Sequence, residues 1–406
     1  MIFTADVVFP VSSPPIPNGA ILVQEGRIAV IGTLEDARTK APEAEIQHYE
    51  GCAITPGAIN THAHLGFRRD DAPEGGTFAG WLGRLIERLP EKESWTPEAA
   101  KNSANEAIAA GTTFMAESSP YGECLPQLAE SGMAGAVFAE FFPGDFPDTQ
   151  PEERVEEILK QVHGMREGLP KRVSAQVSVH SVYTVDPDSS RVAALKTREL
   201  GDPLAIHLSE SPEEVEFVRE GTGGLANIFG SNTWGGAGVS PVRYAENVEL
   251  LAPTTIVAHL ATGVSDEDID ILTRTGVAAA HCPRSNDSLG CEVSPVPEMM
   301  RRGVRVGMGT DGLWSSPSMN LFEETLFAVK LHGFDGELGL RLATLEGARA
   351  LNVERETGSL EVGKWADLAI VQVESGDQTA LDVVESAASG GVAATVVSGN
   401  LIYNRE

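Results

Sequence analysis

Histidines recur in this sequence at the places where short apolar runs end. The first two stand in the stretch THAHLG, where His62 and His64 are separated by one residue. Side chains alternate along a β-strand, so both imidazoles would point to the same face and could reach one metal ion. Neutral imidazole is a good ligand for zinc and for ferrous iron. A lone H-x-H pair is more often two core histidines, so the pair indicates a metal site only together with further ligands.

Further candidate ligands stand at the ends of later apolar runs. His207 lies in LAIHLSE, and Glu210 follows three residues later, where a strand end could turn its carboxylate back over a metal. His259 closes the run TIVAHL, and Asp311 closes GMGTD before a glycine. Each has an ordinary alternative: a solvated loop carboxylate for Glu210, core packing for His259, and a turn residue for Asp311.

The elements that would position these residues alternate between apolar runs and helix-like stretches. Helix start and stop signals mark the stretches 97–111, 151–165, 265–276 and 294–303. The eight apolar runs span 58–65, 112–118, 134–141, 172–180, 204–210, 255–260, 277–282 and 305–311. Eight strands alternating with helices are what a (β/α)8 barrel needs, and active sites of that fold lie at the C-terminal ends of the strands. Six of the nine histidines fall at such ends.

In a barrel of this kind the candidate ligands form one ring. The H-x-H pair and His207 supply three nitrogens and Asp311 a carboxylate, which suits a mononuclear site with one position left for water. A second ion usually requires a bridging anion, such as a carboxylated lysine on the fourth strand. That strand, RVSAQVSVH, ends in His180 and has no lysine near its end. We therefore expect one divalent metal ion, zinc first and iron(II) as the alternative.

Both ends of the chain are typical of β structure. Short runs rich in valine, isoleucine and tyrosine are separated by turn signals near the start, and the closing stretch is similar. We expect an α/β protein in which residues 57–355 form the metal-dependent TIM barrel. Residues 1–56 and 356–406 would pair into a small β-sandwich domain. The Gly-rich segment 221–243 is long for a βα connection and is expected to face the substrate.

Composition narrows the class of partner. The 406 residues include 59 acidic and 30 basic side chains, a formal net charge of −29. So acidic a surface repels phosphate backbones and anionic lipid, and we expect no nucleic-acid or membrane partner. No apolar run reaches the roughly 18 residues of a membrane span, and the first residues lack a basic export signal. The four cysteines form no C-x-x-C pair, which favours free thiols in a reducing cytoplasm.

Taken in order, these motifs resemble the amidohydrolase superfamily. THAHLG, the H-x-x-E of His207 and Glu210, the strand of His259, HCPRSN and GTDG follow its pattern. The closing segment ATLEGARALNVERETGSLEVGKWADLAIV resembles that of its cytosine-deaminase-like and nucleoside aminohydrolase branch. HCPRSN and SPVRY are similar to adenosine-type and aminodeoxyfutalosine deaminases. The resemblance implies a hydrolase of C–N bonds in cyclic amidines, which releases ammonia from a purine nucleoside-like or related aminated heterocycle.

The resemblance also implies what the site residues do. The metal would supply hydroxide near neutral pH, His259 and Asp311 would orient the water and take its proton, and Glu210 would protonate the ring nitrogen beside the attacked carbon. The expected substrate contacts are His180, Trp81, Arg284 and Asn286. Core packing is the alternative for the histidine and the tryptophan, and a solvated side chain for the arginine.

Two other functions fit the sequence less well. A mononuclear metal amidohydrolase that opens a cyclic amide or removes chloride from a triazine would share most ligands. The H-x-x-E motif and the absence of a bridging lysine favour deamination over that reaction. A barrel without catalytic function would be expected to have lost ligands, and all four stand here. The expected partner is a small heterocyclic substrate, neutral or with a single carboxylate, and relatives suggest a homo-oligomer.

Overall fold

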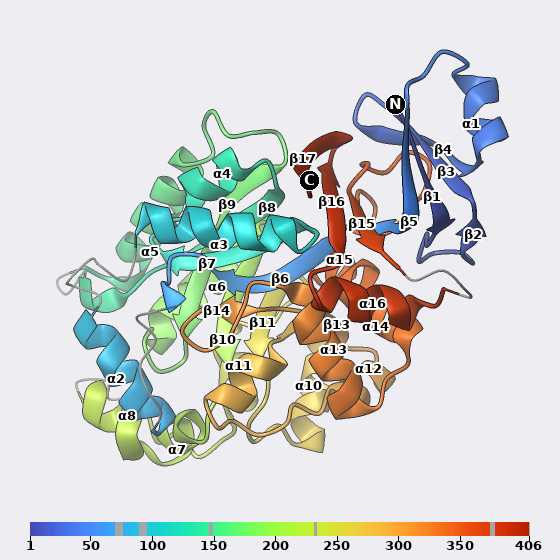
Figure 1. Cartoon of the computed structure of the whole chain (residues 1–406). Helices are drawn as coiled ribbons and strands as arrows, with labels where there is room; N and C mark the ends of the chain where they lie inside the picture. The colour runs from blue at the N-terminus through green and yellow to red at the C-terminus, as the bar shows by residue number, and fades with distance from the viewer. Residues whose placement is uncertain (70–75, 89–95, 146–148, 231–233, 374–377, 406) are drawn as a thin grey trace.

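The computed structural model describes residues 1–69, 76–88, 96–145, 149–230, 234–373 and 378–405 (Figure 1). Its central sheet is parallel and has the strand order β13-β12-β11-β10-β9-β8-β7-β6-β14. These strands are β6 (Ala58–His64), β7 (Thr112–Pro120), β8 (Ala134–Glu140), β9 (Val173–Ser181), β10 (Leu204–Leu208), β11 (Thr255–His259), β12 (Ala278–His281), β13 (Arg305–Met308) and β14 (Asp311–Gly312). All eight predicted runs are therefore strands, the last one divided in two.

The sheet curls round so that its last strand, β14, lies beside its first strand in sequence, β6. β13 pairs with β12, whereas β14, only two residues further on, pairs with β6 through Asp311 opposite Ala63. Thr61 Oγ1 on β6 donates to the carbonyl of Met308 on β13 at 2.8 Å. A Cβ on Gly307 would lie 2.5 Å from Thr61 Cγ2, so glycine is required where β13 passes β6. The α/β class is confirmed, and the curled sheet is consistent with the expected barrel.

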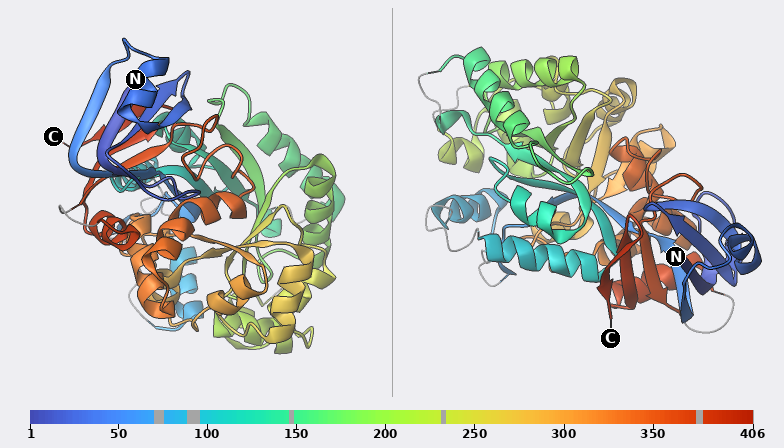
Figure 2. Two further views of the ribbon diagram at one scale, coloured as in Figure 1. Left: turned by 90° about the vertical axis from the view of Figure 1, so that its right-hand side faces the viewer. Right: turned by 90° about the horizontal axis from the view of Figure 1, so that it is seen from above.

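Helices cover the outside of this sheet (Figures 1 and 2). The four predicted helices correspond to α3 (Pro97–Ala109), α5 (Pro151–Gly164), α10 (Asp266–Thr275) and α12 (Val296–Arg301), and each ends within two residues of the predicted stop. α3 begins after Thr96, whose side chain caps the Ala99 N–H, and α10 begins with a capping box of Ser265 and Asp268.

The helices preceding the last barrel strand are α1 (Leu34–Lys40), α2 (Phe78–Arg88), α3 (Pro97–Ala109), α4 (Leu125–Ser131), the 3-10 turn Pro143–Asp145, α5 (Pro151–Gly164), α6 (Pro187–Leu200), α7 (Pro212–Glu220), α8 (Gly223–Ile228), α9 (Pro241–Asn247), α10 (Asp266–Thr275), α11 (Pro283–Ser288) and α12 (Val296–Arg301). Those following it are α13 (Leu321–His332), α14 (Gly336–Ala343), α15 (Leu345–Ala350) and α16 (Ala380–Ala388). None of the helices in the described ranges is long and apolar enough to cross a bilayer.

Strands from the two chain ends share a second sheet. Its order is β17-β16-β15-β5-β1-β3-β4, with β2 paired to β1. The strands are β1 (Ile2–Val8), β2 (Ile16–Pro17), β3 (Gly19–Gln24), β4 (Arg27–Thr33), β5 (Ile46–Pro56), β15 (Leu368–Gln372), β16 (Val392–Val397) and β17 (Asn400–Asn404). β5 joins the two groups, because it is parallel to β1 and antiparallel to β15. Figure 2 shows the blue N-terminal strands beside the red C-terminal ones.

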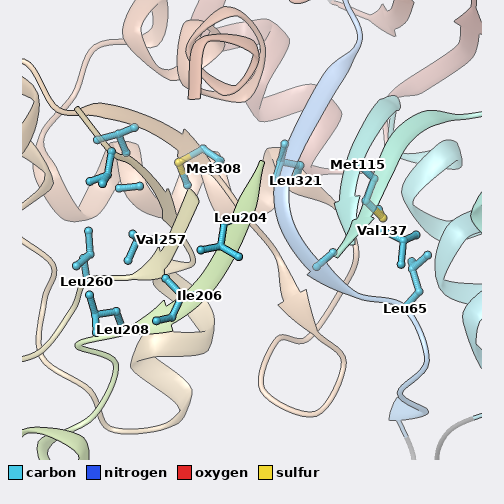
Figure 3. Packing of buried hydrophobic residues seen from close by; sticks show 14 of the residues in the cluster. Leu65, Met115, Val137, Leu204, Ile206, Leu208, Val257, Leu260, Met308 and Leu321 are labelled. Carbon is cyan, nitrogen blue, oxygen red and sulfur yellow. The ribbon is translucent and has the colours of Figure 1, made fainter. Parts of the chain in front are cut away.

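Aliphatic side chains fill the space between the central strands and the helices. Figure 3 shows part of this core, including Leu65, Met115 and Val137, all less than 1% exposed. Every residue of β6, β10 and β11 is buried, as expected for parallel strands covered on both faces. A polar side chain in such a strand must find a partner or bind a ligand, because an unpaired buried polar group is costly.

A buried ion pair attaches the terminal sheet to the central one. Asp367, just before β15, accepts from both terminal nitrogens of Arg172, just before β9, at 2.7 and 2.6 Å. Thr357 Oγ1 donates to the same carboxylate at 2.6 Å, and Asp367 is 2% exposed. The planar guanidinium and the carboxylate thus form a two-bond contact that is shielded from water.

Replacing Asp367 with alanine is expected to lower the free energy of unfolding by up to about 3–5 kcal/mol, because the largely buried Arg172, whose side chain is 14% exposed, would lose its counter-charge. Urea denaturation of the two proteins measures the difference. Glu356→Ala is the control, since its ion pair with Arg27 is exposed and should contribute about 0–1 kcal/mol. Equal losses in the two variants would contradict the proposed attachment.

Candidate active site at the ends of the barrel strands

Three imidazoles and one carboxylate meet where the parallel strands end. His62 and His64 lie on β6, His207 on β10 and Asp311 on β14. The nitrogens available for metal binding on the three histidines lie within 4.8 Å of one another. Asp311 Oδ1 is 3.6 Å from His62 Nε2 and 3.4 Å from His64 Nε2. The structure therefore brings together all four side chains that the sequence nominates as metal ligands.

The hydrogen bonds of these histidines fit a bound cation. His64 Nδ1 lies 2.7 Å from the carbonyl oxygen of Ser118, and His207 Nδ1 lies 2.9 Å from that of His180. A carbonyl only accepts, so each Nδ1 carries the hydrogen and each Nε2 presents a lone pair. The two Nε2 atoms face each other at 3.2 Å. Their lone pairs would repel each other at this distance unless both atoms bind a cation. His62 Nε2, also buried, has no hydrogen-bond partner in the described part of the chain.

The protonation of the four groups suits a divalent ion. Burial lowers the pKa of His64 to about 4 and also lowers the pKa values of His62 and His207. Burial alone would raise the pKa of Asp311, but positive charge in the pocket formed by His62, His64 and His259 lowers that pKa well below its ordinary value, so the pocket favours an ionised carboxylate. Neutral imidazoles and an ionised carboxylate are the forms that bind metal. Three imidazoles and one carboxylate are a donor set that holds a single divalent ion.

Two serines fix the direction of the Asp311 carboxylate. Ser285 Oγ and Ser315 Oγ each donate to Asp311 Oδ2 at 2.6 Å. Its other oxygen, Oδ1, is left facing His62 and His64. The carboxylate is therefore held so that one oxygen is occupied and the other is available at the centre of the site.

Glu210 and His259 lie side by side next to this centre. Glu210 Oε1 is 3.6 Å from His259 Nε2. The Glu214 carboxylate accepts the backbone N–H groups of Ser209 and Glu210, both at 2.8 Å, and so holds the turn that presents Glu210. Burial raises the pKa of Glu210 well above its ordinary value, and the charge of Asp311 raises it further. These surroundings favour the protonated form of Glu210, which can act as a general acid.

Backbone strain is concentrated at the same strand ends. Ser209, His259 and Asp311 all have positive φ angles, of 52°, 75° and 60°. Non-glycine residues pay for this conformation, of the order of 1 kcal/mol or more each, and it persists mainly where the surroundings enforce it. The sharp turns place Glu210, His259 and Asp311 around one point, which a regular strand continuation would not do.

A cavity of about 420 Å³ opens beside the four ligands. The catalytic candidates Glu210, His259 and Asp311 line the cavity. Two of the expected substrate contacts, His180 and Trp81, line it as well. The remaining wall is largely apolar and aromatic, as in many small-molecule sites.

Comparison with known proteins gives the family. The model of the amidohydrolase family matches residues 53–402. The chain belongs to the amidohydrolase family. It is 31% identical to a 5-methylthioadenosine/S-adenosylhomocysteine deaminase of Symbiobacterium thermophilum, across 95% of this chain and 89% of that protein. The resemblance inferred from the motifs is thus confirmed.

Solved structures of two deaminases share the fold. The aminofutalosine deaminase of Helicobacter pylori has a TM-score of 0.84 at 21% identity, and the match covers 99% of this chain and all of that one, 100%. An adenosine deaminase from Xanthomonas campestris with bound zinc has a TM-score of 0.81 at 22% identity, over 98% of this chain and 92% of that one. At these identities the likeness concerns the fold.

The four expected substrate contacts of this amidohydrolase divide into two pairs. His180 and Trp81 line the cavity. Arg284 does not; its guanidinium donates to Glu323 at 2.5 Å and lines a neighbouring hollow. Asn286 is 4% exposed and contacts His259 instead, with its Oδ1 at 3.0 Å from His259 Nδ1. The structure therefore brings two of the four to the cavity and the other two to other partners.

One acidic residue on this cavity was not among the sequence candidates. Glu140 lines it, is 3% exposed, and its Oε1 has no hydrogen-bond partner among the residues that the structure describes. Burial raises the pKa of Glu140 well above its ordinary value. The available signal was its place at the C-terminal end of the third predicted strand, where the barrel would direct it toward the site.

Removing the Asn286 side chain is expected to lower kcat by about 10- to 100-fold, the effect of losing a group that orients a site histidine. The amide oxygen keeps the hydrogen of His259 on Nδ1, so that Nε2 can accept a proton. Steady-state kinetics of Asn286→Ala and Asn286→Asp test this, because the aspartate retains an acceptor and should recover most of the rate. Loss of the same size in both variants would contradict the positioning role.

Proposed function

We propose that this amidohydrolase is a metal-dependent deaminase that removes the exocyclic amino group of a purine nucleoside and releases ammonia. The observation that carries the proposal is the placement of Glu210 and His259, 3.6 Å apart, beside three imidazoles and Asp311. A general acid next to a general base is what hydrolysis of an amidine carbon requires. The names of the relatives, deaminases of methylthioadenosine, S-adenosylhomocysteine and aminofutalosine, support this substrate class.

We assign the metal to His62, His64, His207 and Asp311. The facing lone pairs of His64 and His207 support this assignment. We propose zinc, and the zinc bound in the Xanthomonas campestris deaminase favours it over iron(II). When bound, a divalent ion supplies Lewis acidity and hydroxide near neutral pH.

The protein groups would then move the protons. Glu210 gives its proton to the ring nitrogen beside the amino-bearing carbon, while His259 Nε2 accepts one from the attacking water. Asp311 Oδ1 holds the water in line, since Oδ2 is occupied by the two serines. Glu210 then takes the proton of the hydroxyl on the attacked carbon and passes it to the amino nitrogen, which leaves as ammonia while the hydroxyl oxygen becomes the carbonyl oxygen. His259 returns the proton it took from water to Glu210, 3.6 Å away, which restores both groups. His180 and Trp81 would contact the base from the cavity wall.

A substrate panel tests the function. Zinc-loaded protein is assayed for ammonia release with adenosine, 5′-deoxyadenosine, methylthioadenosine, S-adenosylhomocysteine, aminodeoxyfutalosine, guanine and cytosine. Chloride release from a triazine and opening of a cyclic amide are measured in parallel. We expect ammonia from purine nucleosides. Turnover confined to the triazine or the cyclic amide would overturn the proposal.

We also propose the domain organisation of the chain: residues 57–355 as the barrel, with 1–56 and 356–406 together as a small β-sandwich domain. The sheet shared by both ends supports it, as does a separate apolar cluster that includes Phe3 and Val396. We propose a homo-oligomer in solution, which light scattering of the purified protein tests.

A further inference from the structure

The cavity of the proposed active site has an apolar side formed mainly by α2. Leu82, Leu85 and Ile86 on α2 line it, together with Phe229 directly after α8. Figure 1 shows α2 beside α8, on the side of the central sheet away from the terminal sheet. Hydrocarbon surface of this kind stabilises a ligand only where the ligand is itself apolar.

Aromatic rings continue this apolar side without a break. Phe78 lies with its ring centroid 5.8 Å from that of Trp81 and 6.4 Å from that of Tyr183, and Tyr183 lies 5.8 Å from Phe229. All four rings line the cavity. They provide flat, apolar surfaces on which a ligand can stack.

The charged groups on the cavity are all acidic in the described part of the chain. Glu140, Glu210 and Asp311 line it, and no lysine or arginine of the described ranges does. The nearby Arg284 is directed at Glu323 and Glu324 and does not reach it. Among the described residues, therefore, none would pair with a carboxylate or phosphate that a ligand brought against this apolar side, and burying such a group unpaired is costly.

From this arrangement, and resting on the proposed function, we propose that the cavity selects nucleosides whose 5′ substituent is uncharged and apolar. The amino-bearing carbon must lie beside Glu210 and His259, so the rest of the nucleoside occupies the part of the cavity that α2 and the aromatic rings enclose. A methyl or methylthio group fits that surface. A substituent that carries a carboxylate or a phosphate does not, and Leu82, Leu85 and Ile86 are the residues that discriminate.

Comparing kcat/KM between substrates tests whether the cavity selects apolar 5′ substituents. We expect kcat/KM for methylthioadenosine and 5′-deoxyadenosine to exceed that for S-adenosylhomocysteine by about tenfold or more, and that for adenosine 5′-monophosphate by about a hundredfold or more, since burying an unpaired charge is disfavoured. Calorimetric titration of the deaminated products, methylthioinosine and S-inosylhomocysteine, should give the same order of affinity without turnover. Equal values for methylthioadenosine and S-adenosylhomocysteine would overturn this inference and leave the proposed function intact. If no nucleoside is deaminated by the metal-loaded protein, both fall.

A charge placed on α2 gives the sharper test. Ile86 is 38% exposed, so the chain should fold with arginine there. Ile86→Arg is expected to raise kcat/KM for S-adenosylhomocysteine relative to methylthioadenosine by about tenfold, because a guanidinium pairs with a carboxylate. Leu200→Arg, which adds the same charge at an exposed position on α6 outside the cavity lining, should keep the wild-type ratio. An unchanged ratio in Ile86→Arg, or the same shift in both variants, would contradict the role assigned to this wall.

Discussion

Glu210→Gln is expected to lower kcat for nucleoside deamination by about 10²–10⁴-fold, the usual contribution of a positioned general acid. Glutamine keeps the shape of the side chain, and the backbone of the turn stays bonded to Glu214. It cannot deliver the proton that burial and Asp311 keep on Glu210. The variant should therefore bind its metal and its substrate and fail in the chemical step.

Three measurements separate this outcome from a structural defect. Metal content by mass spectrometry and the thermal unfolding temperature should match those of the wild type, while single-turnover kinetics show the loss. Glu213→Gln is the matched control: it makes the same change on α7, outside the cavity lining, and should keep the wild-type rate. Near-normal turnover by Glu210→Gln would refute the assignment of the proton to this residue.

His207→Ala should abolish both metal binding and activity. It removes one of the three imidazoles and frees His64 Nε2 from its nearest neighbour, 3.2 Å away. Three donors remain, His62, His64 and Asp311, but the site loses its only ligand from β10, so we expect the ion to be held much more weakly. We expect the wild type to carry about one ion per chain and the variant to retain well under half of that.

Chelation and metal readdition make this test stringent. Dialysis against a chelator should inactivate the wild type, and zinc should restore it, whereas His207→Ala should respond to neither. His163→Ala is the control, since His163 lies on α5 and bonds to Asp202, away from the site. A His207→Ala protein that retained its metal and its rate would disprove the proposed ligand set.

The sequence by itself determined which strand ends carry the chemistry. Alternation along a strand places His62 and His64 on one face, and parallel strands of a barrel end at one edge, so His207 and Asp311 had to join them there. Both inferences need only local periodicity and the order of the elements. For the same reason the eight strands, and the ends of the four helices α3, α5, α10 and α12, could be predicted closely, whereas the other helices were not predicted.

Only the tertiary structure decided what surrounds that centre. Arg284 and Asn286 are two residues apart on α11, and a helix turns about 100° per residue, so their side chains leave on nearly opposite sides. One contacts His259 and the other meets Glu323, which the motif HCPRSN could not distinguish. The aromatic wall depends likewise on separate elements: Phe78 and Trp81 lie on α2, whereas Tyr183 follows β9 and Phe229 follows α8. The contacts between these rings follow from packing between distant segments rather than from any pattern along the chain.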